Sequence, residues 1–211
     1  MKLAIGGMLV AALLASLIAY PQLPDRVATH WNMAGDVDGW MPKSVGAFAP
    51  LAIMLAATAL FSVLPRISPK GFELAEATRA YRAILLALLL LLLGLHLVTL
   101  AWNLGYRLPM GIAVSMLLGV FFAILGNYLS KVPRNFFIGV RTPWTLADED
   151  VWFRTHRLAA RTFIGGGLGV AVLAPFAGER YALFLVIAGV IVAAIIPIIY
   201  SYAIYRKEVR P

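Results

Sequence analysis

Residues 83–102 read AILLALLLLLLGLHLVTLAW, a run of 20 residues without a charged side chain. An apolar run of about 20 residues is long enough for a helix to cross the hydrocarbon core of a bilayer. The backbone finds no water there, so its hydrogen bonds must be made within the segment, as in a helix. The stretch therefore predicts a transmembrane helix from Ala83 to Trp102.

Five further apolar runs lie on either side of this one. They are Leu3–Tyr20, Val45–Leu64, Met110–Leu129, Leu158–Ala177 and Tyr181–Tyr200. Of all 211 residues, 62% are apolar and only 13% are charged, and the mean hydropathy is +0.86. The sequence predicts an all-α fold, a polytopic membrane bundle of six transmembrane helices.

The first run also has some features of a signal peptide. Only one charged residue, Lys2, precedes it, and the small-residue pattern of a cleavage site is poor around Tyr20 and Pro21. We expect an uncleaved helix.

The basic residues are distributed unequally between the two sides of the predicted bundle. The net charge is +8. Fourteen of the 18 Lys and Arg residues fall on the side that carries both termini, and four fall on the other. Cytoplasmic loops of membrane proteins carry such an excess. Both termini are therefore predicted to be cytoplasmic, and the basicity indicates topology rather than direct binding of nucleic acid.

The first predicted loop, residues 21–44, faces outward in this topology. Its candidate residues are a histidine, a tryptophan and two aspartates: His30, Trp31, Asp36 and Asp38. Residues 27–31 suit a short extended piece, and turn chemistry begins at Asn32. Three interpretations are open: a turn ordered by side-chain hydrogen bonds, a surface that meets a peptide, or a cation site with an incomplete ligand set.

A second polar segment, residues 131–157, lies on the predicted cytoplasmic side. Its candidate residues carry amide, hydroxyl, aromatic and basic groups: Asn135, Arg141, Thr142, Trp144, Trp152, His156 and Arg157. Trp152 and His156 share a helix face, and the planar fork of Arg141 suits carboxylate or phosphate. Either these side chains lock the loop onto the bundle, or they form a docking site for a partner or a lipid headgroup.

Local signals predict how the helices near these loops begin and pack. Thr145 is a good N-cap for a helix that starts at Leu146 and continues into the fifth span. Helical geometry is expected after Gly71, through Glu73 and Glu76, into the third span. Small residues at a spacing of four, which let two helices approach closely, occur in the last two spans: Gly165 with Gly169, and Gly189 with Ala193.

Three polar residues lie within or near the ends of the spans: His96, Asn103 and Asn127. A small transporter or channel would require such residues to form a continuous path. No span contains an acidic partner for His96, so a proton or cation relay is hard to build. The chain has no cysteine and no recognisable catalytic set, and we expect neither an enzyme nor a cofactor or metal.

The two polar segments resemble the motifs of a known family. Residues of the second segment are similar to the signature of SdpI-type membrane proteins: Asn135, Gly139, Arg141-Thr142-Pro143-Trp144-Thr145, Trp152 and His156-Arg157. Residues of the first loop resemble an N-terminal module that is often fused to it: Leu23-Pro24, His30-Trp31-Asn32, Gly35, Asp38-Gly39 and Lys43.

The resemblance implies a bacterial cytoplasmic (inner) membrane protein of the toxin-immunity class. It divides the chain into an N-terminal two-helix module, residues 1–64, and a four-helix module, residues 65–211. Named members protect a cell from a secreted peptide toxin, and relaying its presence to a transcriptional regulator is also attributed to them. The expected partners are therefore a peptide toxin, a cytoplasmic regulator and the lipid bilayer.

Overall fold

The computed structural model of the chain describes residues 1–74 and 79–208. Within them, six helices are long and apolar enough to cross a membrane, which confirms the predicted all-α bundle. They are α1 (Lys2–Ala19), α3 (Ala49–Val63), α4 (Arg79–Asn103), α5 (Met110–Leu129), α7 (Glu149–Ala177) and α8 (Glu179–Glu208). The shorter elements are η1 (Tyr20–Gln22), β1 (Arg26–Trp31), β2 (Val37–Pro42), α2 (Lys43–Gly46), η2 (Leu64–Ile67) and α6 (Pro143–Ala147).

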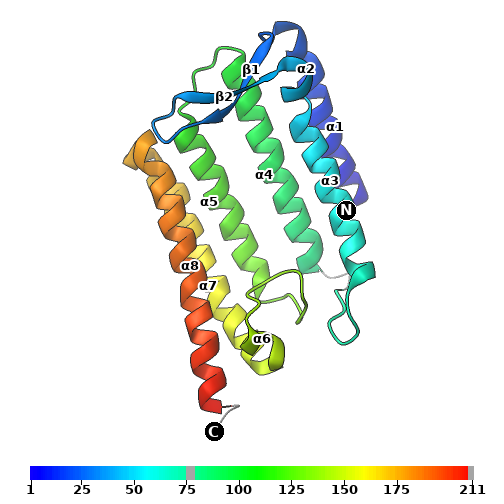
Figure 1. Cartoon of the computed structure of the whole chain (residues 1–211), viewed down its shortest axis with the longest axis vertical. Helices are drawn as coiled ribbons and strands as arrows, with labels where there is room; N and C mark the ends of the chain where they lie inside the picture. Colours follow the sequence, from blue (N-terminus) through cyan, green and yellow to red (C-terminus); the bar gives the residue numbers. More distant parts are fainter. Residues whose placement is uncertain (75–78, 209–211) are drawn as a thin grey trace.

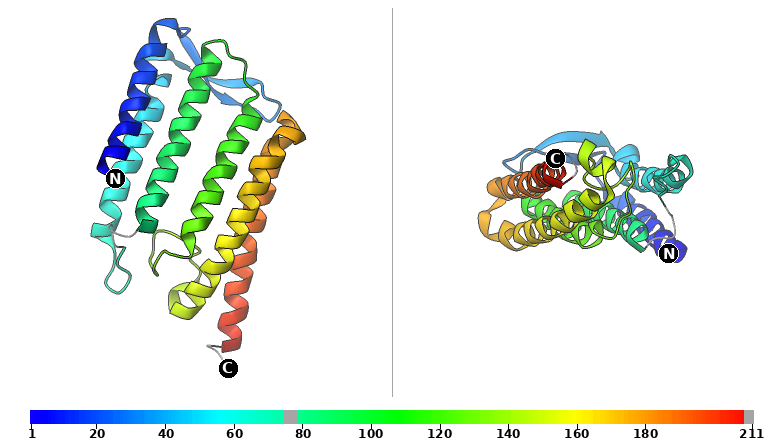
Figure 2. Two further views of the ribbon diagram at one scale, coloured as in Figure 1. Left: turned by 180° about the vertical axis from the view of Figure 1, so that it is seen from behind. Right: turned by 90° about the horizontal axis from the view of Figure 1, so that it is seen from below.

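The long helices run side by side, with a β-hairpin across one end and α6 at the other (Figure 1). Helix α5 packs against α7, and α7 packs against α8. Helix α4 lies beside α5, while α1 and α3 lie against α4 (Figure 2). Both chain termini lie away from the hairpin.

Glycines bring α5 and α7 into backbone contact. A Cβ atom added to Gly167 would lie 2.5 Å from the backbone of Ala123, and one added to Gly119 would lie 2.7 Å from that of Ala171. The predicted packing role of Gly165 and Gly169 is wrong, because nothing lies within 4 Å of a Cβ at either position. The spacing of Gly165 and Gly169 did not identify the face of α7 that contacts α5, which is the face that carries Gly167.

The glycine pair predicted in the last span does lie at a helix contact. A Cβ atom on Gly189 would lie 3.0 Å from the side chain of Val170, and one on Gly166 would lie 3.8 Å from Cβ of Ala193. These residues bring α7 and α8 together.

The outer surface of the bundle is apolar. Large side chains such as Leu3, Phe176 and Ile199 are 93%, 84% and 62% exposed. In water an apolar surface of this extent would promote association. In a bilayer these side chains meet lipid tails, as expected for membrane-spanning helices.

The first loop forms an antiparallel hairpin. The extended piece predicted at residues 27–31 is confirmed as β1, which pairs with β2 so that Ala28 lies opposite Trp40. The second strand was not predicted, because glycine and proline interrupt its sequence. Gly35 makes the turn with a φ of 86°, a conformation that glycine adopts without steric cost.

The predicted start of the helix in the second polar segment is wrong. Thr142, not Thr145, caps α6: the Thr142 hydroxyl accepts from the backbone N–H of Thr145, whose own hydroxyl accepts from the N–H of Thr142. A second cap then starts α7, where the Asp148 carboxylate accepts from the N–H of Val151 at 2.8 Å. Two caps therefore divide what the sequence suggested was one helix.

The predicted helix after Gly71 is also wrong where the structure describes it. Residues 72–74 are not helical, and α4 begins at Arg79. Gly71 has a φ of 83°, which is incompatible with a right-handed helix. Its N–H donates to the Glu73 carboxylate at 2.9 Å and lowers the pKa of that group. Glu76, the other acidic residue of the predicted helix, lies outside the described residues.

Candidate functional site

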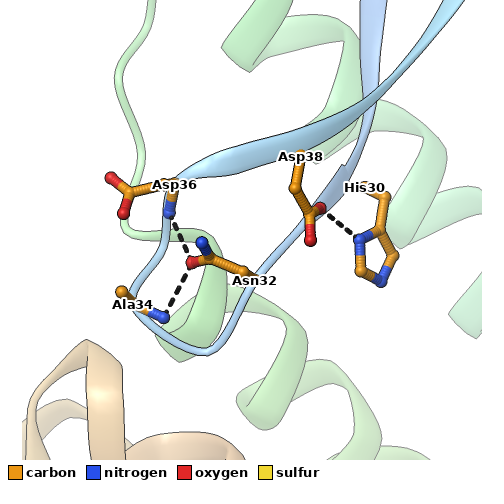
Figure 3. A network of polar contacts seen from close by, with 5 residues as sticks. All are labelled: His30, Asn32, Ala34, Asp36 and Asp38. Carbon is orange, nitrogen blue, oxygen red and sulfur yellow. Dashed lines mark hydrogen bonds and ion pairs between the residues drawn. The ribbon is translucent and has the colours of Figure 1, made fainter.

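The hairpin, residues 26–42, has a turn ordered by one amide side chain. Oδ1 of Asn32 accepts from the N–H groups of Ala34 and Asp36 at 2.9 and 3.0 Å (Figure 3). The backbone N–H of Asn32 donates to the carbonyl of Asp36 at 2.8 Å. This is the hydrogen-bonded Asx turn that the sequence left open as one interpretation.

His30 and Asp38 face one another across the two strands. Nδ1 of His30 bonds Oδ1 of Asp38, and both side chains are largely exposed. The carboxylate of Asp36 points away from this pair (Figure 3). Among residues 1–74 and 79–208, no three His, Asp or Glu side chains gather as a metal-binding group. Two of the three candidate cation ligands are thus brought together, and the third is not.

Trp31 fixes the far end of β1 to the helices below. Its ring packs edge-on against Trp102, with centroids 5.3 Å apart, and the Arg107 guanidinium lies 4.2 Å from the Trp102 ring. The indole N–H of Trp31 is buried without a hydrogen-bond partner in the described part of the chain. An unpaired donor of this kind is available to an acceptor that enters from outside.

Asn103 holds the hairpin onto α4. Its Oδ1 accepts from the N–H of Ala28 at 2.7 Å, and its Nδ2 donates to the carbonyl of Ala28 at 3.0 Å and to that of Thr99 at 2.9 Å. The residue predicted as an intramembrane polar group is therefore a clamp at the helix end.

A cavity of about 360 Å³ lies under the hairpin. Thr29, His30, Trp31 and Asn32 line it from above, and Thr99 lies on its helical wall. The walls of this cavity therefore combine apolar side chains with a few polar groups.

The tip of the hairpin rests on the start of α8. A Cβ atom on Gly35 would lie 2.6 Å from the Glu179 carboxyl carbon. The same carboxylate accepts from the N–H of Gly111, the second residue of α5, at 3.1 Å. Glu179 carries no functional signal in the sequence, because its local context indicates only a charge in the first turn of a helix.

In the signature segment, residues 131–157, one buried amide organises the loop. Oδ1 of Asn135 accepts from the N–H groups of Phe137 and Ile138, both at 2.7 Å. Its Nδ2 donates to the carbonyls of Pro133 and Ile138 at 2.8 and 3.0 Å. Asn135 is fully buried, and all its hydrogen-bonding capacity is used within the loop.

Trp152 and His156 stack on one face of α7, as their spacing predicted. Their ring centroids are 3.9 Å apart, and both side chains are fully buried. The Trp152 N–H donates to the Val132 carbonyl at 3.0 Å. His156 donates from Nδ1 to the Trp152 carbonyl at 2.8 Å, and its Nε2 accepts from the N–H of Val140 at 2.9 Å. Gly139, with a φ of 118°, lets the loop approach this ring.

Hydroxyl groups attach the segment to α8. The Thr142 hydroxyl bonds that of Ser201 at 3.1 Å, and the Thr145 hydroxyl donates to the Val140 carbonyl at 2.8 Å. Ser201 was not expected, because a lone serine in an apolar helix carries no signal of its partner. Together with the bonds of Asn135 and His156, these hydrogen bonds hold the loop on the bundle, as the loop-locking interpretation expects.

The remaining candidates of the segment do not join this network. Arg141 is exposed and donates to the carbonyl of Phe136. Trp144 packs against Tyr202, with ring centroids 4.9 Å apart. Arg157 is exposed on α7. Of the predicted constellation of Arg141, Trp144, Trp152 and His156, only Trp152 and His156 contact each other as a ring pair.

The polar residues expected along the spans have separate surroundings. His96 is buried, and its Nε2 lies 2.9 Å from the Ser16 hydroxyl and 3.3 Å from the Ala12 carbonyl. The Ser16 hydroxyl also donates to the Ala47 carbonyl at 2.7 Å. Asn127 is exposed on the bundle surface. His96 therefore ties helices together, while Asn103 ties down the hairpin.

The chain is similar to known proteins in both of its polar regions. The SdpI/YfhL protein family matches residues 131–201, and a domain of unknown function (DUF1648) matches residues 7–55. Immunity protein SdpI of Bacillus subtilis (strain 168) is 31% identical over 198 residues, which cover 92% of this chain and 90% of the relative. The chain belongs to the SdpI family. No solved structure matches it. The SdpI-family match contains the whole signature segment and the Ser201 that anchors it.

Proposed function

We propose that this SdpI-family protein is an immunity and signalling protein of the bacterial cytoplasmic membrane. It protects the cell from a secreted, membrane-active peptide toxin. The single observation that carries the proposal is the similarity to an immunity protein over 92% of the chain. That similarity extends over the hairpin module as well as the signature segment, so both polar regions are included.

The hairpin is the surface we assign to the toxin. The excess of basic residues on the side of the two termini supports a cytoplasmic location for that side and an outward-facing hairpin. Met33, Trp40 and Met41 are 44%, 46% and 40% exposed on it, beside the polar pair of His30 and Asp38. Aromatic and methionine side chains with a few polar groups are typical of peptide-recognition surfaces.

Helix α8 supports a relay from this surface to the cytoplasm. Its first residue, Glu179, lies against the hairpin tip, and Ser201 near its other end bonds Thr142 of the signature segment. A single continuous helix thus contacts both polar regions. Toxin on the hairpin shifts α8, and the signature segment presents that change to a cytoplasmic regulator.

A small transporter or channel is the alternative from another functional class. It requires a continuous polar path through the bundle. His96 bonds Ser16, Asn103 bonds Ala28, and Asn127 is exposed at the surface. These separate partners favour the immunity proposal.

The test is survival of a sensitive bacterium that expresses the protein and is challenged with a secreted, membrane-active peptide toxin. Asp38→Asn should lower survival at equal protein level. Asp25→Asn is the matched control, since Asp25 is also exposed but pairs with Lys43 instead. The site assignment fails if His30→Ala, Asp38→Asn, Arg141→Gln and Trp152→Phe all protect as well as the wild type. The function itself fails if the wild type gives no protection.

A further inference from the structure

A groove of about 440 Å³ opens beside the signature segment, at the end of the bundle opposite the hairpin. Its walls come from Leu125 and Leu129 of α5, Phe163 of α7, and Ala194 and Ile198 of α8. Every one of these side chains is apolar. The volume falls within the range of about 300–1,000 Å³ that is typical of ligand pockets.

Arg141 is the charged residue of this groove. It is exposed, and one of its guanidinium nitrogens donates to the Phe136 carbonyl. A guanidinium carries five N–H donors. Within residues 1–74 and 79–208, no carboxylate forms an ion pair with Arg141. Positive charge and free donors therefore remain at the groove.

Neighbouring basic side chains are engaged by the protein itself. Arg134 donates to the Leu146 carbonyl at 3.1 Å and stacks on Phe72. Lys131 lies over the Tyr128 ring, 4.9 Å from its centroid. None of the residues that line the groove is acidic. The groove thus combines apolar walls with an uncompensated positive charge at the level where α5 ends.

We propose that this groove binds one anionic phospholipid of the surrounding leaflet. An acyl chain lies along α5 and α8, between Leu125 and Ile198, and the headgroup phosphate accepts hydrogen bonds from Arg141. The fork of donors on arginine matches phosphate oxygens, and apolar walls suit a hydrocarbon chain. This inference goes beyond the proposed immunity function and does not depend on it.

Native mass spectrometry of the purified full chain tests the headgroup contact. The protein in detergent is titrated with phosphatidylglycerol and, separately, with phosphatidylethanolamine that carries the same acyl chains. The wild type should retain one phosphatidylglycerol in preference to phosphatidylethanolamine. Arg141→Gln should weaken that binding roughly fivefold, which corresponds to about 1 kcal/mol for one basic side chain near anionic lipid. Arg157→Gln is the matched control, since Arg157 is exposed on the same side but does not line the groove.

The groove itself is tested by filling it. Ala194→Phe should abolish the preferential binding while Arg141 is retained. Ala194→Leu places a smaller side chain in the groove and is used if Ala194→Phe does not fold. Ile195→Phe is the control, because Ile195 is 47% exposed and does not line the groove. Each variant is compared only if it elutes as a single species with the wild-type thermal midpoint.

Three results would overturn the proposal. One is unchanged phosphatidylglycerol binding in Arg141→Gln or in a folded Ala194 variant. Another is an equal loss in Arg157→Gln, which would indicate attraction by net charge alone. The third is displacement of the lipid by glycerol phosphate, which has the headgroup chemistry without acyl chains.

Discussion

Asn135 satisfies four backbone groups with one buried amide, so its removal should destabilise the whole loop. Asn135→Ala leaves the N–H groups of Phe137 and Ile138 without their acceptor. Leaving buried polar groups unpaired costs about 1–3 kcal/mol. We expect a loss of that size in the free energy of unfolding, measured by denaturant titration in detergent. Asn127→Ala, at an exposed position, should change it by no more than about 0.5 kcal/mol. Equal effects would contradict the network.

Gly139 lets the loop backbone approach the His156 ring closely. A Cβ atom there would lie 2.2 Å from Nε2, and the φ of 118° disfavours any other residue. Gly139→Ala should cost about 1–3 kcal/mol for the backbone conformation alone, and more because the Val140–His156 hydrogen bond is displaced. Gly71→Ala is the control, since Gly71 also has positive φ but no atom within 4 Å of its Cβ. Thermal unfolding should separate the two variants, and identical midpoints would refute the close contact.

At the scale of helices, the glycine face decides how α5 and α7 pack. Gly167→Ala inserts a methyl group against the α5 backbone, 2.5 Å from the N atom of Ala123. Overpacking of this kind costs about 1–3 kcal/mol. Gly165→Ala meets open space, and the higher helix propensity of alanine makes it neutral or slightly stabilising. Unfolding of both variants in one detergent gives the comparison. A larger loss for Gly165→Ala would mean that the opposite face is packed.

The hairpin depends on Asn103 for its attachment to α4. Asn103→Leu keeps the approximate side-chain volume but removes both bonds to Ala28. The Ala28 amide, now without its acceptor, should exchange with deuterium at least tenfold faster, which corresponds to about 1.4 kcal/mol of lost protection. Amides in the middle of α5 should keep their wild-type rates. Unchanged exchange at Ala28 would show that packing alone holds the hairpin.

For the molecule as a whole, the sequence predicted what depends on composition and local pattern. The apolar runs predicted the six long helices, and the spacing of Trp152 and His156 predicted that they share a helix face, where they stack. What it missed depends on pairing between distant segments. Nothing near Ser201 or Glu179 in sequence indicates the loop residue that each contacts. Likewise, the spacing of Gly165 and Gly169 predicted a helix contact at these two residues. The assembled bundle shows instead that Gly167 faces α5.

The proposed toxin site on the hairpin and the proposed regulator site on the signature segment both depend on the orientation of the molecule in the membrane. This orientation can be measured directly. The chain contains no cysteine, so single-cysteine variants report one position each. Asp38→Cys on the hairpin should react with a membrane-impermeant maleimide on intact cells, because Asp38 is exposed and its side of the bundle carries four of the 18 basic residues. Arg157→Cys, also exposed but on the opposite side, should react only after the membrane is permeabilised. The reverse pattern would place the signature segment outside and remove the hairpin from any secreted peptide.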